Sequence, residues 1–151
     1  MRILDSKNIN YEVVTYDPTM EVDGEEIARQ CGLEPGEVFK TLVTEGKSHE
    51  LYVFLVPVKD HLDLSRGASV VGEKNLSLLH LKYLREKTGY ERGGCSPIGM
   101  KKSFPVVIDQ QAQTSGIIYI NGGKKGYQIR IKLDDLIELT DASVENIVKD
   151  E

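Results

Sequence analysis

Lys40 is the first residue of this sequence whose type and position could do chemistry. It lies in segment 38–44, which is apolar on both alternation faces, and alternation puts its side chain beside Val38 and Leu42. A lysine in such a strand loses hydration unless an anion or another partner compensates it. One interpretation is a cation that faces a phosphate or a developing oxyanion. The other is a buried stem whose ammonium group reaches water at the sheet edge.

The glycine-rich loop Gly93-Gly-Cys-Ser-Pro-Ile-Gly99 is the second candidate. Its glycines allow successive backbone N–H groups to point into one concavity, where they could hold an anion or a polarised carbonyl oxygen. The loop lacks the G-x-G-x-x-G spacing of a dinucleotide site, and an irregular connection between a helix and a strand would have the same composition. Cys95 has no histidine near it in the sequence, which favours a buried or incidental thiol over a nucleophile.

A turn rich in glycine and lysine, Asn121-Gly-Gly-Lys-Lys-Gly126, is the third candidate. Its residues tolerate positive φ and predict a hairpin turn. With Lys101 and Lys102, its two lysines could also form a basic rim for a nucleic-acid backbone, although such pairs usually lie on a solvated surface. The three histidines lie too far apart for metal-ligand spacing, so no metal site is predicted.

The predicted elements place these candidates on a mixed sheet. Strands are expected at 11–16, 38–44, 51–58, 105–109, 117–121 and 127–132, with hairpins at 38–58 and 117–132. Helices are expected after the capping residues Asp23, Asp63 and Ser77, and short helices around Leu136 and Ile147. Hairpins at both ends with helices between them predict an α+β fold with a mixed β-sheet, not a doubly wound α/β fold.

Composition limits the class of protein. The 151 residues carry 19 basic and 24 acidic side chains, a net charge of −5, and 40% are hydrophobic, which is typical of one globular domain spanning 1–151. The longest apolar run, 51–58, is far shorter than the about 20 residues of a membrane helix, and no secretory leader is recognised. Two cysteines predict no disulfide framework, so a cytoplasmic protein is expected. The acidic balance disfavours a protein that coats nucleic acid nonspecifically, and no DNA partner is expected, although a local basic face stays open.

Taken together, the motifs occur in the order and spacing of the YbaK/EbsC family, which the chain resembles over about residues 5–136. The resemblance rests on Phe39-Lys-Thr-Leu42, Gly93-Gly-Cys-Ser-Pro-Ile-Gly99, Phe104-Pro-Val-Val-Ile-Asp109 and Ile118-Tyr-Ile-Asn-Gly-Gly123, with further matches at Tyr16, Asp17-Pro18, Pro57 and Leu62-Asp-Leu64. This family comprises aminoacyl-tRNA deacylases that edit mischarged tRNA and are related to the editing domain of bacterial prolyl-tRNA synthetase. The resemblance implies a mixed sheet or partly closed barrel flanked by helices, no cofactor, the aminoacylated 3′ end of tRNA as partner, and prolyl-tRNA synthetase as a further candidate partner.

The resemblance also implies a role for each site residue. Lys40 would be catalytic and would hold the ester in place through the terminal adenosine or its phosphate. The substrate-binding positions would be Tyr16, Phe39, Thr41, Gly94, Ser96, Pro97, Gly99, Asn121, Gly122, Gly123 and Gln128. Asn121 and Gln128 depart from the cysteine-removing branch, which typically has serine and aspartate there. That aspartate could pair with the substrate α-ammonium, whereas the amide of Gln128 can only hydrogen-bond to it.

The implied activity is trans-editing of mischarged tRNA, foremost Cys-tRNA(Pro). A prolyl synthetase pocket discriminates against a smaller amino acid by only about 1–3 kcal/mol, so a separate hydrolytic check is the usual remedy. In the mechanism attributed to the cysteine branch, the substrate thiol attacks its own ester carbonyl, and the enzyme only orients the ester and stabilises charge. Two alternatives stay open: a deacylase for an alanyl or other small aminoacyl ester that uses an ordered water, and a non-catalytic module that binds tRNA ends or the synthetase.

Overall fold

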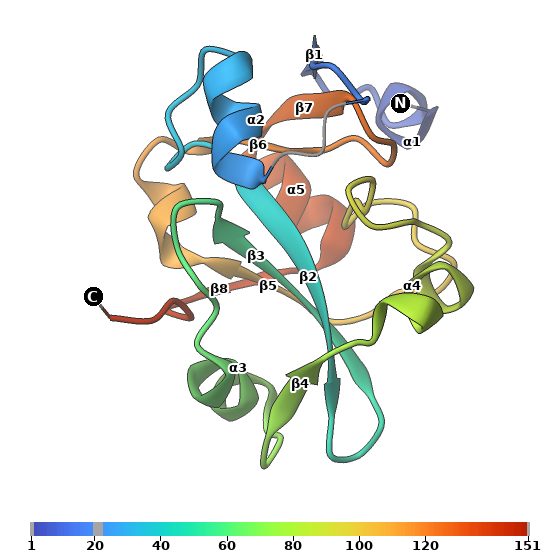
Figure 1. The fold of residues 1–151 in the computed structure, drawn as a ribbon, viewed down its shortest axis with the longest axis vertical. Helices are drawn as coiled ribbons and strands as arrows, with labels where there is room; N and C mark the ends of the chain where they lie inside the picture. The colour runs from blue at the N-terminus through green and yellow to red at the C-terminus, as the bar shows by residue number, and fades with distance from the viewer. Residues whose placement is uncertain (1, 20–22, 151) are drawn as a thin grey trace.

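The strands of the computed structural model, which describes residues 2–19 and 23–150, lie in two sheets (Figure 1). The first sheet has the order β1–β7–β6, with β1 at Tyr11–Thr15, β7 at Tyr127–Lys132 and β6 at Ile117–Asn121. The second has the order β4–β2–β3–β5–β8, with β4 at Leu76–Leu78, β2 at Phe39–Gly46, β3 at Leu51–Pro57, β5 at Val106–Asp109 and β8 at Ser143–Glu145. Because β3–β5 and β5–β8 are parallel pairs and the others are antiparallel, the predicted mixed sheet is confirmed.

Helices connect and cover these sheets. Within residues 2–19 and 23–150 they are α1 at Arg2–Ser6, α2 at Gly24–Gln30, α3 at Leu64–Val71, α4 at Leu81–Thr88, α5 at Leu133–Thr140 and the 3₁₀ turn η1 at Gln110–Gln113. The predicted caps of α2 and α3 are confirmed, since the carboxylates of Asp23 and Asp63 accept N–H groups of the first helical turn. None of these helices is long and apolar enough to cross a membrane.

The helix predicted after Ser77 begins three residues later than expected. Ser77 lies in the edge strand β4, and α4 is capped by the side chain of His80. Leu78, Leu81 and Leu84 have helical spacing, but Leu78 and Leu81 are 57% and 54% exposed, so the spacing does not mark one buried helix face. The helix ends at Thr88, and the next residue, Gly89, is in the αL conformation typical of a helix end.

The helix predicted around Ile147 is wrong. Beyond β8, residues 146–150 form no helix, and Val148 pairs with Leu62 in an isolated antiparallel bridge. The side chain of Ile147 is fully buried. Its N–H donates to the carboxylate of Asp109, at the end of β5, over 3.1 Å. This long-range hydrogen bond fixes the backbone in an extended course that the local sequence does not reveal.

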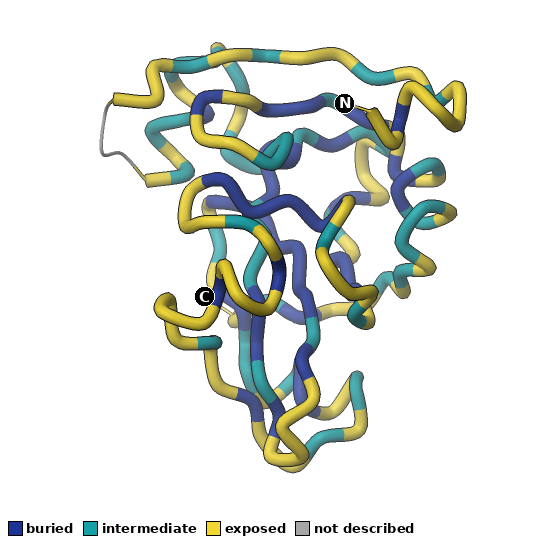
Figure 2. Tube along the Cα trace, turned by 90° about the vertical axis from the view of Figure 1, so that its right-hand side faces the viewer, coloured by how far each residue is buried: buried dark blue, intermediate teal, exposed yellow. Residues whose placement is uncertain are grey.

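Strand β2 is covered on both faces, as predicted. Phe39 and Val43 belong to the main apolar cluster, which both sheets share, whereas Leu42 packs against the cluster of Phe54 and Val56 on the opposite face. Figure 2 shows the buried stretches following the strands through the middle of the molecule, with exposed residues concentrated in the connections. Lys40 therefore projects from the same face of β2 as Leu42, whereas Phe39 and Thr41 project from the opposite face.

The two sheets meet at the start of β2 without closing into a barrel. Val38 forms an isolated parallel bridge with Tyr119 of β6, and the Tyr119 N–H donates to the carbonyl of Glu37 over 2.9 Å. In the described chain a second isolated bridge joins Leu62 and Val148, and the remaining strand pairing stays within each sheet. The partly closed barrel implied by the resemblance is thus represented only by this junction between Val38 and Tyr119. The junction lies beside a cavity that Val38 helps to line.

Candidate active site

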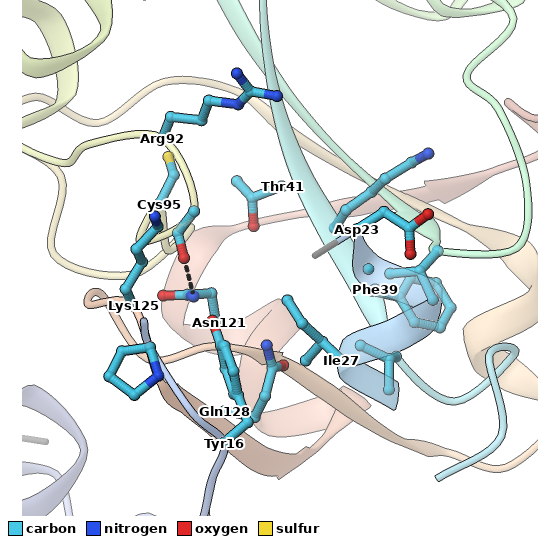
Figure 3. A pocket seen from close by; sticks show the side chains of 16 residues that line it. Tyr16, Asp23, Ile27, Phe39, Thr41, Arg92, Cys95, Asn121, Lys125 and Gln128 are labelled. Atoms are coloured by element: carbon cyan, nitrogen blue, oxygen red, sulfur yellow. Dashed lines mark hydrogen bonds between the residues drawn. The ribbon is translucent and has the colours of Figure 1, made fainter. Parts of the chain in front are cut away.

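A cavity of about 680 Å³ lies where the start of β2 meets α2, the glycine-rich loop and the β6–β7 sheet (Figure 3). Half of the predicted site residues line it: Tyr16, Phe39, Lys40, Thr41, Asn121 and Gln128. These residues come from four separate parts of the sequence. The structure therefore brings Lys40 together with Asn121 and Gln128, the two positions at which the sequence differs from the expected serine and aspartate.

The other six predicted positions are not among the residues that line this cavity. Gly94, Ser96, Gly122 and Gly123 are not among its lining residues, although Gly93 and Cys95 of the same loop are. Pro97 and Gly99 line a second, smaller cavity of about 260 Å³ on the side of the loop that faces α1 and α5. Contact of these six residues with substrate stays a prediction.

Ser96 has a structural role within the loop. It is fully buried, and its hydroxyl oxygen accepts the N–H of Ile98 over 3.1 Å. The ring hydroxyl of Tyr90 donates to the carbonyl of the same Ile98. These two hydrogen bonds fix the curvature of the loop and so hold its first residues against the cavity.

Asn121 fastens the loop to the β6–β7 turn. Its Nδ2 donates to the carbonyl of Gly93 over 2.8 Å, and its Oδ1 accepts the N–H groups of Gly123 and Lys124 over 2.7 and 3.1 Å. Gly94 permits this approach, because a Cβ atom there would lie 3.1 Å from the backbone of Lys124. The carboxamide of Asn121 thus shapes one wall of the cavity through backbone contacts.

Lys40 is partly buried and has carboxylates around it. Burial lowers the pKa of its ammonium group below the ordinary value of 10.5, and the negative charges of Asp60, Glu25 and Asp23 oppose that shift. From the sequence, Asp23 is recognisable only as a helix cap, and Asp60 and Glu25 do not stand out as site residues. Asp60 follows β3 by three residues and Glu25 lies in the first turn of α2, and only the fold brings both towards Lys40.

Two buried polar atoms in the cavity lining have no hydrogen-bond partner. They are Thr41 Oγ1 and Gln128 Oε1, and no other buried side-chain oxygen or nitrogen in the described chain lacks one. Gln128 is only 5% exposed. Figure 3 shows both side chains directed into the space between β2 and β7. Because leaving a buried polar atom unpaired costs about 1–3 kcal/mol, this pair points to a ligand that completes the hydrogen bonds.

Cys95 lines the cavity as a neutral thiol. Its side chain is buried, and burial raises its pKa to about 11, although a hydrogen bond with Thr88 acts in the opposite direction. A thiol with this pKa is almost wholly protonated at neutral pH and is a poor nucleophile. The interpretation of Cys95 as a buried thiol is therefore confirmed by its environment.

The remaining lining residues include features that sequence reasoning missed. Arg92, just before the glycine-rich loop, and Lys125 put positive charge at the cavity mouth, and Ile27 and Val58 supply apolar walls. Lys125 was expected in a basic rim, but Arg92 was overlooked although it adjoins the loop motif. Along residues 2–19 and 23–150, no group of three or more His, Cys, Asp or Glu side chains has the geometry to hold a metal ion.

Comparisons with known proteins give this cavity a context. Residues 18–139 match the family described as "Aminoacyl-tRNA editing domain". A relative from Enterococcus faecalis (strain ATCC 700802 / V583), named "Putative Cys-tRNA(Pro)/Cys-tRNA(Cys) deacylase EbsC", is 37% identical over 152 residues, which cover 100% of this chain and 93% of the relative.

Solved structures share the fold over almost the whole chain. One, described as "a putative trans-editing enzyme for prolyl tRNA synthetase", is 28% identical with a TM-score of 0.86 and covers 97% of this chain and 92% of its own. Another, of hypothetical protein APE2540, is 21% identical with a TM-score of 0.88 and covers 98% of this chain and 97% of its own. The second likeness bears on the fold alone.

Proposed function

The chain belongs to the aminoacyl-tRNA editing domain family, and from this premise we propose that it deacylates mischarged tRNA, with Cys-tRNA(Pro) as its main substrate. Members of this family act on aminoacyl-tRNA esters, so the chain is an enzyme of that class. The observation that carries the proposal is the pair of unpartnered polar atoms, Thr41 Oγ1 and Gln128 Oε1, in a cavity whose thiol, Cys95, is held neutral. The site is built to hold a polar group and supplies no activated cysteine.

The substrate supplies the nucleophile in this mechanism. The cysteinyl thiol, with an ordinary pKa near 8.5, is a few per cent thiolate at neutral pH. Its sulfur forms a bond to the ester carbonyl carbon, the bond from that carbon to the ribose oxygen breaks, and the ribose oxygen takes up a proton. The four-membered thiolactone that results is opened by water to give free cysteine. The enzyme needs to orient the ester and stabilise the developing oxyanion.

The residues that line the cavity have different roles in this mechanism. Lys40 holds the terminal adenosine or its phosphate and so fixes the ester, while Tyr16 and Phe39 border the bound group. Gln128 Oε1 accepts a hydrogen bond from the substrate α-ammonium, and Thr41 Oγ1 bonds to the aminoacyl group beside it. The loop amides around Gly94, which starts a run of buried residues, offer N–H groups to the carbonyl oxygen of the ester. The cavity wall that carries these amides is supported by five further residues: Ser96, Pro97, Gly99, Gly122 and Gly123.

The proposal extends to partner, location and organisation. We propose prolyl-tRNA synthetase as a partner because one structural relative is described as a putative trans-editing enzyme for that synthetase. A tRNA substrate fits the expected cytoplasmic location. Residues 1–151 act as one domain in this proposal, because one apolar cluster combines residues of both sheets.

A panel of charged tRNAs tests the proposal. Cysteinyl, seryl and alanyl esters of tRNA(Pro) are incubated with the protein at physiological salt, and free amino acid is measured. We expect cysteinyl tRNA to be cleaved much faster than seryl tRNA, since a hydroxyl is far less acidic than a thiol, and Cys95→Ala to keep most of the activity. Equal rates on the cysteinyl and seryl esters, or a natively folded but inactive Cys95→Ala protein, would overturn the substrate-assisted mechanism. Faster cleavage of alanyl tRNA would support the alternative with an ordered water.

A further inference from the structure

Positive charge is concentrated in two short stretches of this acidic chain. Segment 80–102 carries six basic and two acidic side chains, and Lys124 and Lys125 follow in the β6–β7 turn, so these stretches together have a net charge of +6. The rest of the chain has a net charge of −11. Such separation creates one surface that attracts a polyanion and leaves a remainder that repels it.

Two of the three basic side chains of α4, Lys82 and Arg85, lie in a row on one side of the helix. Lys82, Arg85 and the C-cap Gly89 have the spacing i, i+3, i+7, which puts them on the same face. The side chain of Lys101 packs against Gly89, with its Cγ 3.2 Å from the position of a Cβ atom there, and so extends the row. Lys82, Arg85 and Lys101 are all exposed. Lys87 lies about 140° around the helix from Lys82 and is not part of the row.

This row continues to the mouth of the active-site cavity. Arg85 Nη1 lies 3.5 Å from the carboxylate of Glu91, so the row faces the start of the glycine-rich loop. The next residue, Arg92, lines the cavity together with Lys125, whose side chain packs against Gly93. Figure 1 shows the loop rising from the end of α4 towards the β6–β7 sheet. We call Lys82, Arg85, Lys101, Arg92 and Lys125 the basic track.

We propose that the basic track binds the sugar–phosphate backbone of the tRNA acceptor stem while the charged 3′ end occupies the cavity; this inference rests on the proposed function. Across the cavity from Arg92, Asp23 lines the wall near Lys40 (Figure 3), and Glu25 and Asp60 also act on the charge of Lys40. This negative charge disfavours RNA phosphates there beyond the terminal nucleotide that Lys40 holds. A strand of phosphates must therefore leave the cavity on the side of Arg92. A line of exposed cations is complementary to an RNA backbone, whose phosphates repeat at regular spacing. It is less complementary to a protein surface, which carries charges of both signs.

Charge reversal on α4 tests this track without altering the cavity lining. Lys82→Glu, Arg85→Glu and the double variant are compared with Lys87→Glu, a matched control on the same helix with the same charge change. A glutamate is favourable in the first turn of a helix and unfavourable in the last, so Lys87→Glu is the more disruptive of the two lysine variants. Any loss confined to Lys82→Glu is thus not a folding effect.

Two readouts are measured for each protein. Binding of uncharged tRNA(Pro) is titrated at several salt concentrations, and deacylation is compared between Cys-tRNA(Pro) and a cysteinyl ester of adenosine, which lacks the stem. We expect the double variant to bind tRNA at least tenfold more weakly, and the slope of its log–log salt dependence to fall by about one for each phosphate that is no longer neutralised. The ratio of kcat/KM for tRNA to that for the adenosine ester should fall at least tenfold, and Lys87→Glu should stay within about twofold of wild type in both readouts.

The outcomes separate this inference from the function on which it rests. Unchanged tRNA binding in the double variant, or equal losses in Lys87→Glu, would overturn the track. So would a double variant that binds tRNA normally but no longer binds prolyl-tRNA synthetase, because the surface would then dock a protein. If the wild-type protein cleaves neither ester, the proposed function fails, and the titrations of uncharged tRNA still decide whether the track binds RNA.

Discussion

Replacing Thr41 by valine should raise stability and lower activity at the same time. Valine removes the hydroxyl with little change in shape, and Thr41 Oγ1 is buried without a hydrogen-bond partner. Since such an atom costs about 1–3 kcal/mol, we expect the free energy of unfolding to rise by about 1 kcal/mol. In the proposed complex the same hydroxyl bonds to the aminoacyl group, so its loss should cost about 1–2 kcal/mol of transition-state binding. That corresponds to about a fivefold to thirtyfold fall in kcat/KM.

Thr44→Val is the matched control on the same strand. Thr44 is also buried, but its Oγ1 donates to the carbonyl of Tyr52 over 3.0 Å. Losing that bond should lower the free energy of unfolding by about 1 kcal/mol, with kcat/KM within about twofold of wild type. Urea unfolding and steady-state deacylation of Cys-tRNA(Pro) measure both quantities. If Thr41→Val is destabilised as much as Thr44→Val, or deacylates at the wild-type rate, the hydroxyl is not reserved for a ligand and the reasoning is refuted.

Substitutions of Lys40 and Asp109 test the site and the core. Lys40→Ala should lower kcat/KM at least tenfold, or roughly 1.4 kcal/mol, with a native circular dichroism spectrum; a wild-type rate would reject its assignment. Because burial lowers the pKa of Lys40 below 10.5, its ammonium loses its proton at a lower pH than a free lysine. The wild-type pH–rate profile should therefore fall on the alkaline side below pH 10.5, and this fall should be absent in Lys40→Arg. Asp109→Ala should lower the free energy of unfolding by about 2–4 kcal/mol in urea, because the buried carboxylate accepts the N–H groups of Gln111 and Ile147, each over 3.1 Å. A loss under about 1 kcal/mol would show that other groups replace it.

Most strands of this fold could be predicted from the sequence because their apolar residues are contiguous and buried. The expected ranges 38–44 and 51–58 correspond to β2 and β3, and the turn between them joins two antiparallel strands as expected. The caps of α2 and α3 were also predictable, since an aspartate side chain bonds to N–H groups only two or three residues away. Such interactions are local and can be read from neighbouring residues.

The elements that were mispredicted depend on contacts far along the chain. Ser77 is in a strand because β4 pairs with the end of β2, more than 30 residues earlier. The segment around Ile147 is extended because the carboxylate of Asp109 binds its backbone. The candidate site follows the same rule. Lys40 could be singled out as a polar residue in an apolar strand, whereas only the fold brings Asp60 towards Lys40 and Arg92 to the cavity.

The neutral amide of Gln128 limits the cost of burying a polar side chain in the cavity wall. A carboxylate at this 5% exposed position would be a buried charge, which costs far more than a buried amide unless a cation compensates it. The amide keeps an acceptor for the substrate α-ammonium but gives up the charge–charge attraction that an aspartate would add. Under the proposed mechanism, selection then depends less on the binding of the ammonium, which every aminoacyl ester carries. It depends more on the side chain that can attack the carbonyl, because Cys95 remains a neutral thiol and offers no competing nucleophile.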